Sequence, residues 1–355
     1  MSRTLGALAA LGLGFISCAQ GEPSPDRDLG YRPSVILGSD EGPGSLPGYA
    51  TDLLRQANGS WVLFTAPGLP MVFTADGDFV GELGAHGEGP GEFETAYFGA
   101  ALPGDSILVS DPSQGRVQIL SPETGSGRSV WLPCGAERIL PVAWPDTVLF
   151  VGRSCGQALG PWLRLVDLST TQAELTRSFG DTAKTRAAVD RRVITSPQSG
   201  EVWLVHGERG WNAKRWSLDG RLIAELEEEP HWLEEGRREA RSDSFPHPAI
   251  VAVEVIPGDT LVLGALVPRP AWQEAWADVE SPGPFPDQRP HEAELWETLV
   301  EYRDPRSGDV LGSQRVPGVL FRILKDGSFA TRDIRGPGFP FVTVYVRDGS
   351  STTGL

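Results

Sequence analysis

Six tight-turn signals, each followed at once by a short run of strand-forming residues, constrain the fold of this chain more than any other feature. A turn pair such as Asn-Gly or Asp-Gly beside an apolar run is typical of a β-hairpin. The six hairpins are expected at 58–63, 104–109, 145–150, 199–204, 258–263 and 326–331. Their spacing of roughly forty to seventy residues matches the period of propeller blades around a central channel. The sequence therefore predicts an all-β fold, a six-bladed β-propeller of four-stranded antiparallel blades.

A second set of turns supports the same division of the chain. These turns lie at 76–78, 122–126, 169–171, 219–221, 307–309 and 348–349. Each follows the first turn of its repeat by roughly twenty residues, as expected if two further strands separate the two hairpins of a blade. In the fifth repeat this interval is stretched, which predicts an insertion near 266–295. Another insertion is expected near 228–248.

The ends of the repeat region predict how the ring closes. The polar residues 350–355 are too few for a fourth strand in the sixth blade, whereas an extended run, Tyr31 to Leu37, precedes the first blade. We expect this run to pair with the last blade as its outer strand, because that pairing removes an exposed sheet edge. The propeller would then span 31–349, followed by a C-terminal tail over 350–355.

The first residues have the pattern of an export signal. Arg3 precedes a short apolar run over 5–16, as in the n-region and h-region of a secretory signal. The residues up to Cys18 resemble a bacterial lipobox, whose cysteine is diacylated. We therefore expect a lipoprotein-type signal peptide over 1–17, a lipid anchor on Cys18 and a flexible tether over 18–30. An ordinary signal peptide, cleaved nearby, is the alternative.

Charge and cysteine content limit the partners and the compartment. The formal net charge of −16 repels phosphate backbones and anionic lipid heads, so we expect no nucleic acid partner and membrane contact only through the lipid. The protein would be a monomer that faces the periplasm or the cell surface, on the outer membrane if the cell has one. Cys134 and Cys155 could form a disulfide in such an oxidising compartment. Two separate buried thiols are the alternative.

A glycine-rich stretch carries a family resemblance. Residues 83–93, Leu-Gly-Ala-His-Gly-Glu-Gly-Pro-Gly-Glu-Phe, resemble a linker in the six-bladed β-propeller proteins common among exported bacterial proteins, which are distantly similar to NHL-repeat propellers. Residues 109–111 and 116–119 likewise resemble an NHL-type blade. The resemblance implies a fold and supplies no catalytic residues. Because the stretch lacks the Lys and Ser or Thr of a phosphate loop, we interpret it as a link between blades, with Phe93 packed between them.

Charged residues on the innermost strands are candidates for a channel site. The expected innermost strands carry Asp52, Arg55, Arg138, Asp190, Arg192, Glu254 and Arg322. Strand alternation sends about half of them inward, without indicating which half. The candidate channel lining is Arg138, Arg192, Glu254 and Arg322. Acids matched by arginines are more typical of a charge-paired lining than of a metal cage, so we expect no metal and no cofactor.

The insertion in the fifth repeat provides a candidate partner surface. Trp272 and Trp276 are spaced i and i+4 just after a proline, and Trp296 follows. Exposed tryptophans suit a protein interface, where aromatic anchors carry much of the binding energy. The alternative is that they pack against one mouth of the ring.

These observations favour a binding or interaction module over an enzyme. Its ligand would be an unknown protein or a small polar molecule. A lactonase-like, metal-dependent hydrolase acting at the channel is the alternative function, and a structural scaffold of the envelope is the third.

Overall fold

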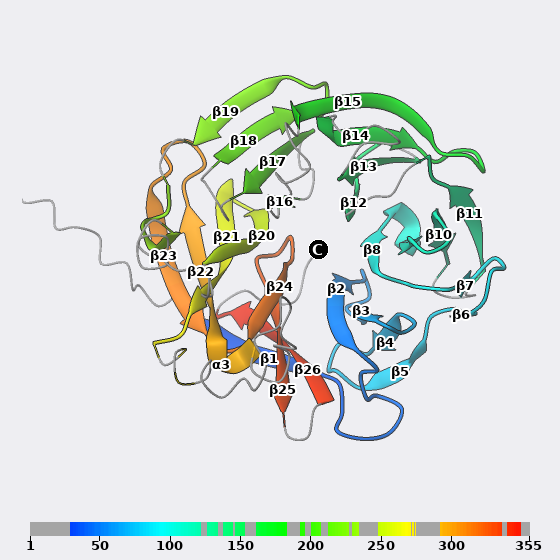
Figure 1. Ribbon diagram of the computed structural model, residues 1–355, viewed down its shortest axis with the longest axis horizontal. Helices are drawn as coiled ribbons and strands as arrows, with labels where there is room; N and C mark the ends of the chain where they lie inside the picture. The colour runs from blue at the N-terminus through cyan, green and yellow to red at the C-terminus, as the bar shows by residue number, and fades with distance from the viewer. Residues whose placement is uncertain are drawn as a thin grey trace, which may run out of the picture.

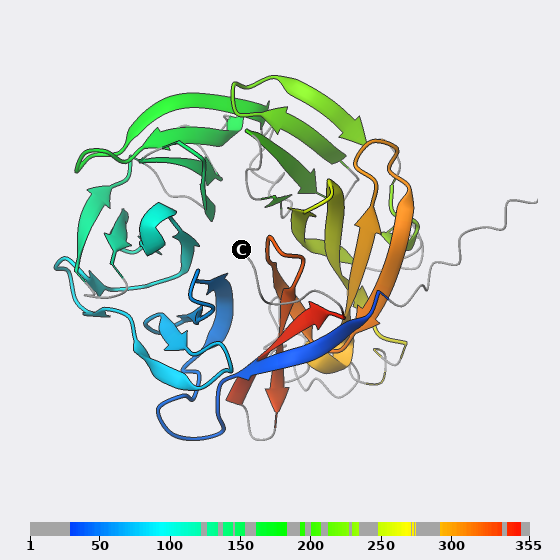
Figure 2. The same cartoon turned by 180° about the vertical axis from the view of Figure 1, so that it is seen from behind.

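The computed structural model shows a ring of six four-stranded antiparallel sheets around a central axis (Figures 1 and 2). The residues described are 29–121, 126–133, 138–144, 146–152, 161–182, 192–195, 200–206, 212–226, 229–233, 248–270, 272, 274, 292–335 and 339–348. Within them the predicted all-β, six-bladed β-propeller is confirmed.

The strands of the first five blades run outward from the axis in chain order. Blade 1 contains β2 (Tyr49–Arg55), β3 (Trp61–Ala66), β4 (Met71–Phe73) and β5 (Phe79–Glu82), and blade 2 contains β8 (Phe98–Ala101), β9 (Ile107–Asp111), β10 (Arg116–Leu120) and β11 (Gly127–Trp131). Blade 3 contains β12 (Arg138–Pro141), β13 (Thr147–Val151), β14 (Pro161–Asp167) and β15 (Glu174–Thr182), and blade 4 contains β16 (Arg192–Ile194), β17 (Glu201–His206), β18 (Asn212–Ser217) and β19 (Leu222–Leu226). Blade 5 contains β20 (Ala249–Ile256), β21 (Thr260–Pro268), β22 (Trp296–Arg303) and β23 (Val310–Val316).

The sixth blade closes the ring with strands from both ends of the propeller. It contains β24 (Val319–Ile323), β25 (Phe329–Arg335) and β26 (Phe339–Arg347), and its outermost strand is β1 (Tyr31–Leu37). β1 pairs antiparallel with β26, from Tyr31 opposite Arg347 to Leu37 opposite Val342. The predicted closure by an N-terminal strand is therefore confirmed, and β26 has no unpaired edge there.

The turns predicted from local sequence lie between the strands as expected. The innermost hairpin of blade 1 turns at Gly59, with φ of +86°, a value that favours glycine. In three other blades an aspartate occupies the left-handed position of the corresponding turn. These residues are Asp105, Asp146 and Asp259, with φ of +60°, +50° and +57°. Asp is one of the few side chains that tolerates this region, because it can hydrogen-bond locally.

The hydrophobic core is divided into layers between the blades. Six clusters of buried side chains lie between neighbouring blades, one for each pair of neighbours. Because both faces of a blade pack against neighbours, central strands are apolar on both sides, and every residue of β3 is buried. Phe93 is fully buried and lies with Phe64 of blade 1 and Ile107 of blade 2 in one such cluster. This confirms the expected packing of Phe93 between blades.

The glycine-rich stretch is a structural link held by blade 2. Two short parallel strands, β6 (Ala85–His86) and β7 (Glu92–Phe93), form within it. The Arg116 guanidinium donates to the backbone oxygens of Glu88 at 2.6 Å, Gly89 at 3.3 Å and Glu92 at 2.8 Å. These three carbonyl groups of the glycine-rich stretch are thus bound within the protein, which agrees with a link between blades rather than a phosphate loop.

The longest connection within a blade joins β21 to β22. It covers residues 269–295 and contains the short helix α3 (Glu292–Leu295). The Arg269 N–H donates to the Leu295 oxygen at 3.0 Å, so the two ends of the connection meet beside the blade. Among the described residues, no helix combines the length and hydropathy needed to span a bilayer.

Candidate functional site

The innermost strands of three blades carry a β-bulge at the same place. The register shifts between Ala50 and Asp52 in β2, between Ile250 and Ala252 in β20, and between Leu320 and Arg322 in β24. A bulge leaves one residue unpaired and re-aims the side chains beside it. Asp52 and Arg322 both follow such a bulge. They therefore occupy equivalent positions on β2 and β24, the innermost strands of two neighbouring blades (Figure 1).

Asp52 is the centre of a charged group contributed by three blades. The Asp52 side chain is 4% exposed; its Oδ1 lies 3.5 Å from Arg322 Nε of β24 and 4.0 Å from Arg138 Nη2 of β12. The same carboxylate accepts the N–H of Leu53 at 2.9 Å and of Gly99, on β8, at 3.3 Å. We call Asp52, Arg138 and Arg322 the channel cluster.

The small residues of β8 let this cluster form across a blade. β8 lies between β2 and β12 in the ring and has the sequence Phe-Gly-Ala-Ala. A Cβ atom at Gly99 would lie 2.3 Å from Cζ of Phe64 and 2.9 Å from the oxygen of Leu108. Only glycine fits there, and its N–H reaches Asp52 as a result.

The channel cluster contains more cationic groups than anionic ones. Burial raises the pKa of Asp52, and the opposing effects of Arg322 and of the N–H groups of Leu53 and Gly99 do not cancel the rise. Two guanidinium groups thus face a single carboxylate that is itself costly to ionise. The Arg322 and Arg138 side chains are 11% and 23% exposed.

The other two channel candidates do not join this cluster through any described ion pair. Glu254 is buried on β20, where its Oε1 accepts the N–H of Val255 at 3.0 Å. Arg192 begins β16 and pairs with His206, and its side chain lies outside the described residues. The structure thus brings Arg138 and Arg322 together around Asp52 rather than around Glu254. Within the described ranges, no three His, Cys, Asp or Glu side chains are grouped so that they could hold a metal ion.

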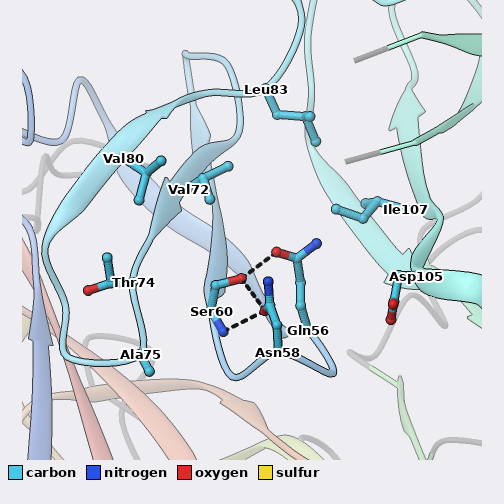
Figure 3. Close-up of a pocket in the computed structure, with 10 residues that line it drawn as sticks. All are labelled: Gln56, Asn58, Ser60, Val72, Thr74, Ala75, Val80, Leu83, Asp105 and Ile107. Atoms are coloured by element: carbon cyan, nitrogen blue, oxygen red, sulfur yellow. Dashed lines mark hydrogen bonds between the residues drawn. The ribbon is translucent and has the colours of Figure 1, made fainter. Parts of the chain in front are cut away.

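A separate cavity of about 550 Å³ opens between the first two blades (Figure 3). Its lining consists of Gln56, Asn58, Ser60, Val72, Thr74, Ala75, Val80, Leu83, Asp105 and Ile107. The hairpin between β2 and β3 supplies the amide groups, blade 1 supplies most of the aliphatic wall, and Asp105 and Ile107 come from blade 2. We call this space the inter-blade cavity.

Internal hydrogen bonds orient the amide groups of the inter-blade cavity. Ser60 Oγ lies 2.5 Å from Gln56 Oε1 and 2.6 Å from Asn58 Oδ1, and the Ser60 N–H also donates to Asn58 Oδ1 at 2.9 Å. Both amide oxygens are therefore used within the hairpin. The amide nitrogens of Gln56 and Asn58 donate to no other described residue, and they remain as donors for a ligand. In the sequence, the turn alone explains Asn58, so nothing there indicates this second role.

The candidate partner surface is described in part. Trp296 begins β22 and is half-buried against the core between blades 5 and 6. Trp272 is also half-buried, and its backbone N–H donates to the backbone oxygen of Arg269 at 3.0 Å. Trp276 lies outside the described residues, as do Cys18, Cys134 and Cys155. Of the described tryptophans of this surface, Trp296 therefore packs against the ring.

Trp232, in the connection between β19 and β20, also packs on the ring. Trp232 donates its Nε1–H to Glu301 Oε2 at 3.1 Å and lies against the cores beside blade 5. Glu301 also accepts the Nε–H of Arg303 at 2.6 Å, so this connection is fixed to a buried ion pair.

The comparisons with known proteins identify the fold. No protein-family model and no curated protein sequence matches the chain. A solved structure of a DUF4221 family member from Bacteroides vulgatus is 10% identical, with a TM-score of 0.61 over 90% of this chain and 99% of that one. A second, from Bacteroides fragilis and named as exported, is 12% identical, with a TM-score of 0.53 over 90% of this chain and 97% of that one. Over 90% of its length the chain therefore shares its fold with these two proteins.

Proposed function

We propose that the protein is an exported, lipid-anchored binding module that takes a small, uncharged polar ligand in the inter-blade cavity. The observation that carries the proposal is the make-up of this cavity. Small-molecule sites are concave, mostly apolar and equipped with a few convergent polar groups, within about 300 to 1,000 Å³. The cavity of about 550 Å³ has this size and combination.

The lining supports a ligand that carries carbonyl or hydroxyl groups. The free amide nitrogens of Gln56 and Asn58 are donors, and the Asp105 carboxylate on the facing blade is an acceptor. Val72, Leu83 and other aliphatic side chains provide an apolar contact surface between them. An uncharged ligand is favoured because the described residues that line the cavity include no cationic side chain to receive an anion.

The proposed localisation of the protein rests on its first residues. The signal-like segment over 1–17 and the lipobox-like cysteine, Cys18, support export and anchoring. The name of one structural neighbour, an exported protein, supports this localisation. Metabolic labelling with a radioactive or alkyne-bearing fatty acid tests the anchor, because a Cys18→Ser variant should lose the label.

Thermal unfolding with a panel of sugars, nucleosides and short neutral peptides tests the binding role. We expect at least one compound to raise the midpoint, and a Val80→Trp substitution to abolish the rise. Val80 lines the cavity and is 63% exposed on β5, so a larger side chain fills the cavity without disturbing the core.

Leu311→Trp is the matched control for this experiment. Leu311 is an aliphatic residue on β23, the outermost strand of blade 5, and is 48% exposed. This variant should respond to the compound like the native protein. Equal responses of the two variants, or no response to any compound, would contradict a site between the first two blades.

A further inference from the structure

The two arginines of the channel cluster have more hydrogen-bond donors than their surroundings use. A guanidinium group carries five N–H donors and no acceptor. Arg322 Nε is buried and makes no hydrogen bond to any described residue, although Asp52 Oδ1 lies 3.5 Å away. Arg138 makes no hydrogen bond to the described residues either, and its nearest approach to Asp52 is 4.0 Å. Neither guanidinium group thus spends a donor on a hydrogen bond to the described residues.

Asp52 makes no close contact with either arginine, since its Oδ1 lies 3.5 Å from Arg322 Nε and 4.0 Å from Arg138 Nη2. Oδ1 accepts the N–H of Leu53 and Oδ2 accepts the N–H of Gly99. These bonds fix the carboxylate on β2, from which it attracts the guanidinium groups without a close bidentate contact. Asp52 thus acts as a positioning residue.

We propose that Arg138 and Arg322 form a site for a carboxylate-bearing ligand at the innermost ring of strands, positioned by Asp52. A planar carboxylate matches the fork of a guanidinium group, and charge-assisted hydrogen bonds of this kind are strong where water is partly excluded. The low exposure of Arg322 provides such exclusion, and the larger exposure of Arg138 leaves an approach from solvent.

The charges favour a monoanion over a dianion such as phosphate. At a pH above the raised pKa of Asp52, two guanidinium groups and one carboxylate leave an excess of a single positive charge, which one carboxylate group of a ligand neutralises. A second negative charge would be opposed by Asp52 and by the overall charge of −16. The site is distinct from the inter-blade cavity, since none of its three residues lines that cavity.

Titration calorimetry of the purified protein with benzoate and acetate at fixed ionic strength tests this inference. Benzamide and acetamide serve as uncharged probes of the same shapes, and inorganic phosphate serves as the dianionic probe. We expect the carboxylates to bind, the amides not to bind, and phosphate to bind more weakly. Arg322→Gln and Arg138→Gln should each weaken carboxylate binding about tenfold or more, because each removes charge-assisted hydrogen bonds.

Matched controls separate this site from charge in general and from the inter-blade cavity. Arg315→Gln removes a surface arginine on β23 that is 49% exposed, and it should leave carboxylate binding unchanged. Val80→Trp should also leave it unchanged, even though it blocks the inter-blade cavity. Failure of the cavity ligand screen thus leaves the channel result intact, and the reverse also holds.

A direct spectroscopic readout guards against variants that fail to fold. The Arg322 Nε–H resonance of the native protein should shift on addition of benzoate and stay unchanged with benzamide. Absence of that shift, equal binding of the amides, or undiminished binding in both folded glutamine variants would each overturn the inference.

Discussion

Gln314 hydrogen-bonds to both backbone polar groups of Tyr31. The Tyr31 N–H donates to Gln314 Oε1 at 3.0 Å, and Gln314 Nε2 donates to the Tyr31 oxygen at 3.2 Å. Tyr31 begins β1, the strand that closes the sixth blade, whereas Gln314 lies on β23 of the fifth blade. One side chain thus imitates the pairing of a further strand and ties the closing strand to a neighbouring blade.

Gln314→Ala should loosen ring closure. It removes two hydrogen bonds to a backbone that is otherwise screened from water, which costs about 1 to 3 kcal/mol of unfolding free energy. Urea unfolding measures this cost, and hydrogen exchange should show faster exchange in β1 than in the other outer strands. Gln172→Ala is the control, because Gln172 is exposed and makes described hydrogen bonds only through its backbone; an equal loss of stability in both variants would contradict the proposed role of Gln314.

A buried tyrosine pair makes the closure sensitive to alkali. The Tyr31 hydroxyl donates to the Gly327 oxygen at 2.6 Å and lies 2.5 Å from the Tyr302 hydroxyl. Burial is the main cause that raises the pKa of both tyrosines. The native state therefore keeps protons that the unfolded chain loses above about pH 10, so stability holds below that pH and falls above it.

Tyr302→Phe isolates this effect. The variant lacks one of the two titrating groups, so its unfolding free energy should fall less steeply between pH 10 and 11 than that of the native protein. Denaturant unfolding at a series of pH values measures both slopes. Identical slopes would show that the alkaline loss has another origin.

The turns and the ring closure were predictable because their causes are local. Gly59 and Asp105 occupy positions with positive φ, which only a few residue types tolerate, so the turns are visible in the sequence itself. The extended run from Tyr31 to Leu37 likewise had one unpaired sheet edge to pair with, that of the sixth blade. Six repeats of these signals were enough to predict the propeller.

The channel cluster was not predictable in the same way. Alternation identifies inward-facing side chains only in regular strands, and the bulges before Asp52 and Arg322 interrupt it. The approach of Arg138 from the third blade depends on the small residues of β8, including Gly99, which carry no charge signal. The inter-blade cavity was missed because Asn58 is explained by its turn.

Asp52 should impose a pH dependence opposite to that of an ordinary paired carboxylate. Burial raises its pKa in the folded protein, so the native state holds a proton that the unfolded chain has already lost. Its contribution to stability therefore falls as pH rises from about 4 through the raised value. Asp52→Asn should remove this falling component from a stability profile between pH 4 and 8, and an unchanged profile would contradict the raised pKa.

Gly99→Ala should disturb both the fold and the channel cluster. The added Cβ would meet the Phe64 ring at 2.3 Å, and overpacking of this kind costs about 1 to 3 kcal/mol. The displaced β8 should also weaken carboxylate binding at Arg138. Gly81→Ala on β5 is the matched control, because its Cβ would meet nothing within 4 Å, and it should change stability by less than about 0.5 kcal/mol.

Metal addition distinguishes a binding module from a metal-dependent hydrolase. A ligand at a hundredfold excess over its dissociation constant adds about 2.7 kcal/mol to native stability, which is visible as a higher midpoint of thermal unfolding. We expect equal midpoints in EDTA and in calcium, zinc, manganese or magnesium, because the Asp52 carboxylate is already bound by two N–H groups and faces two arginines. A rise with one metal, lost in Glu254→Gln, would instead place a cation beside β20 and direct substrate screens to lactones and esters.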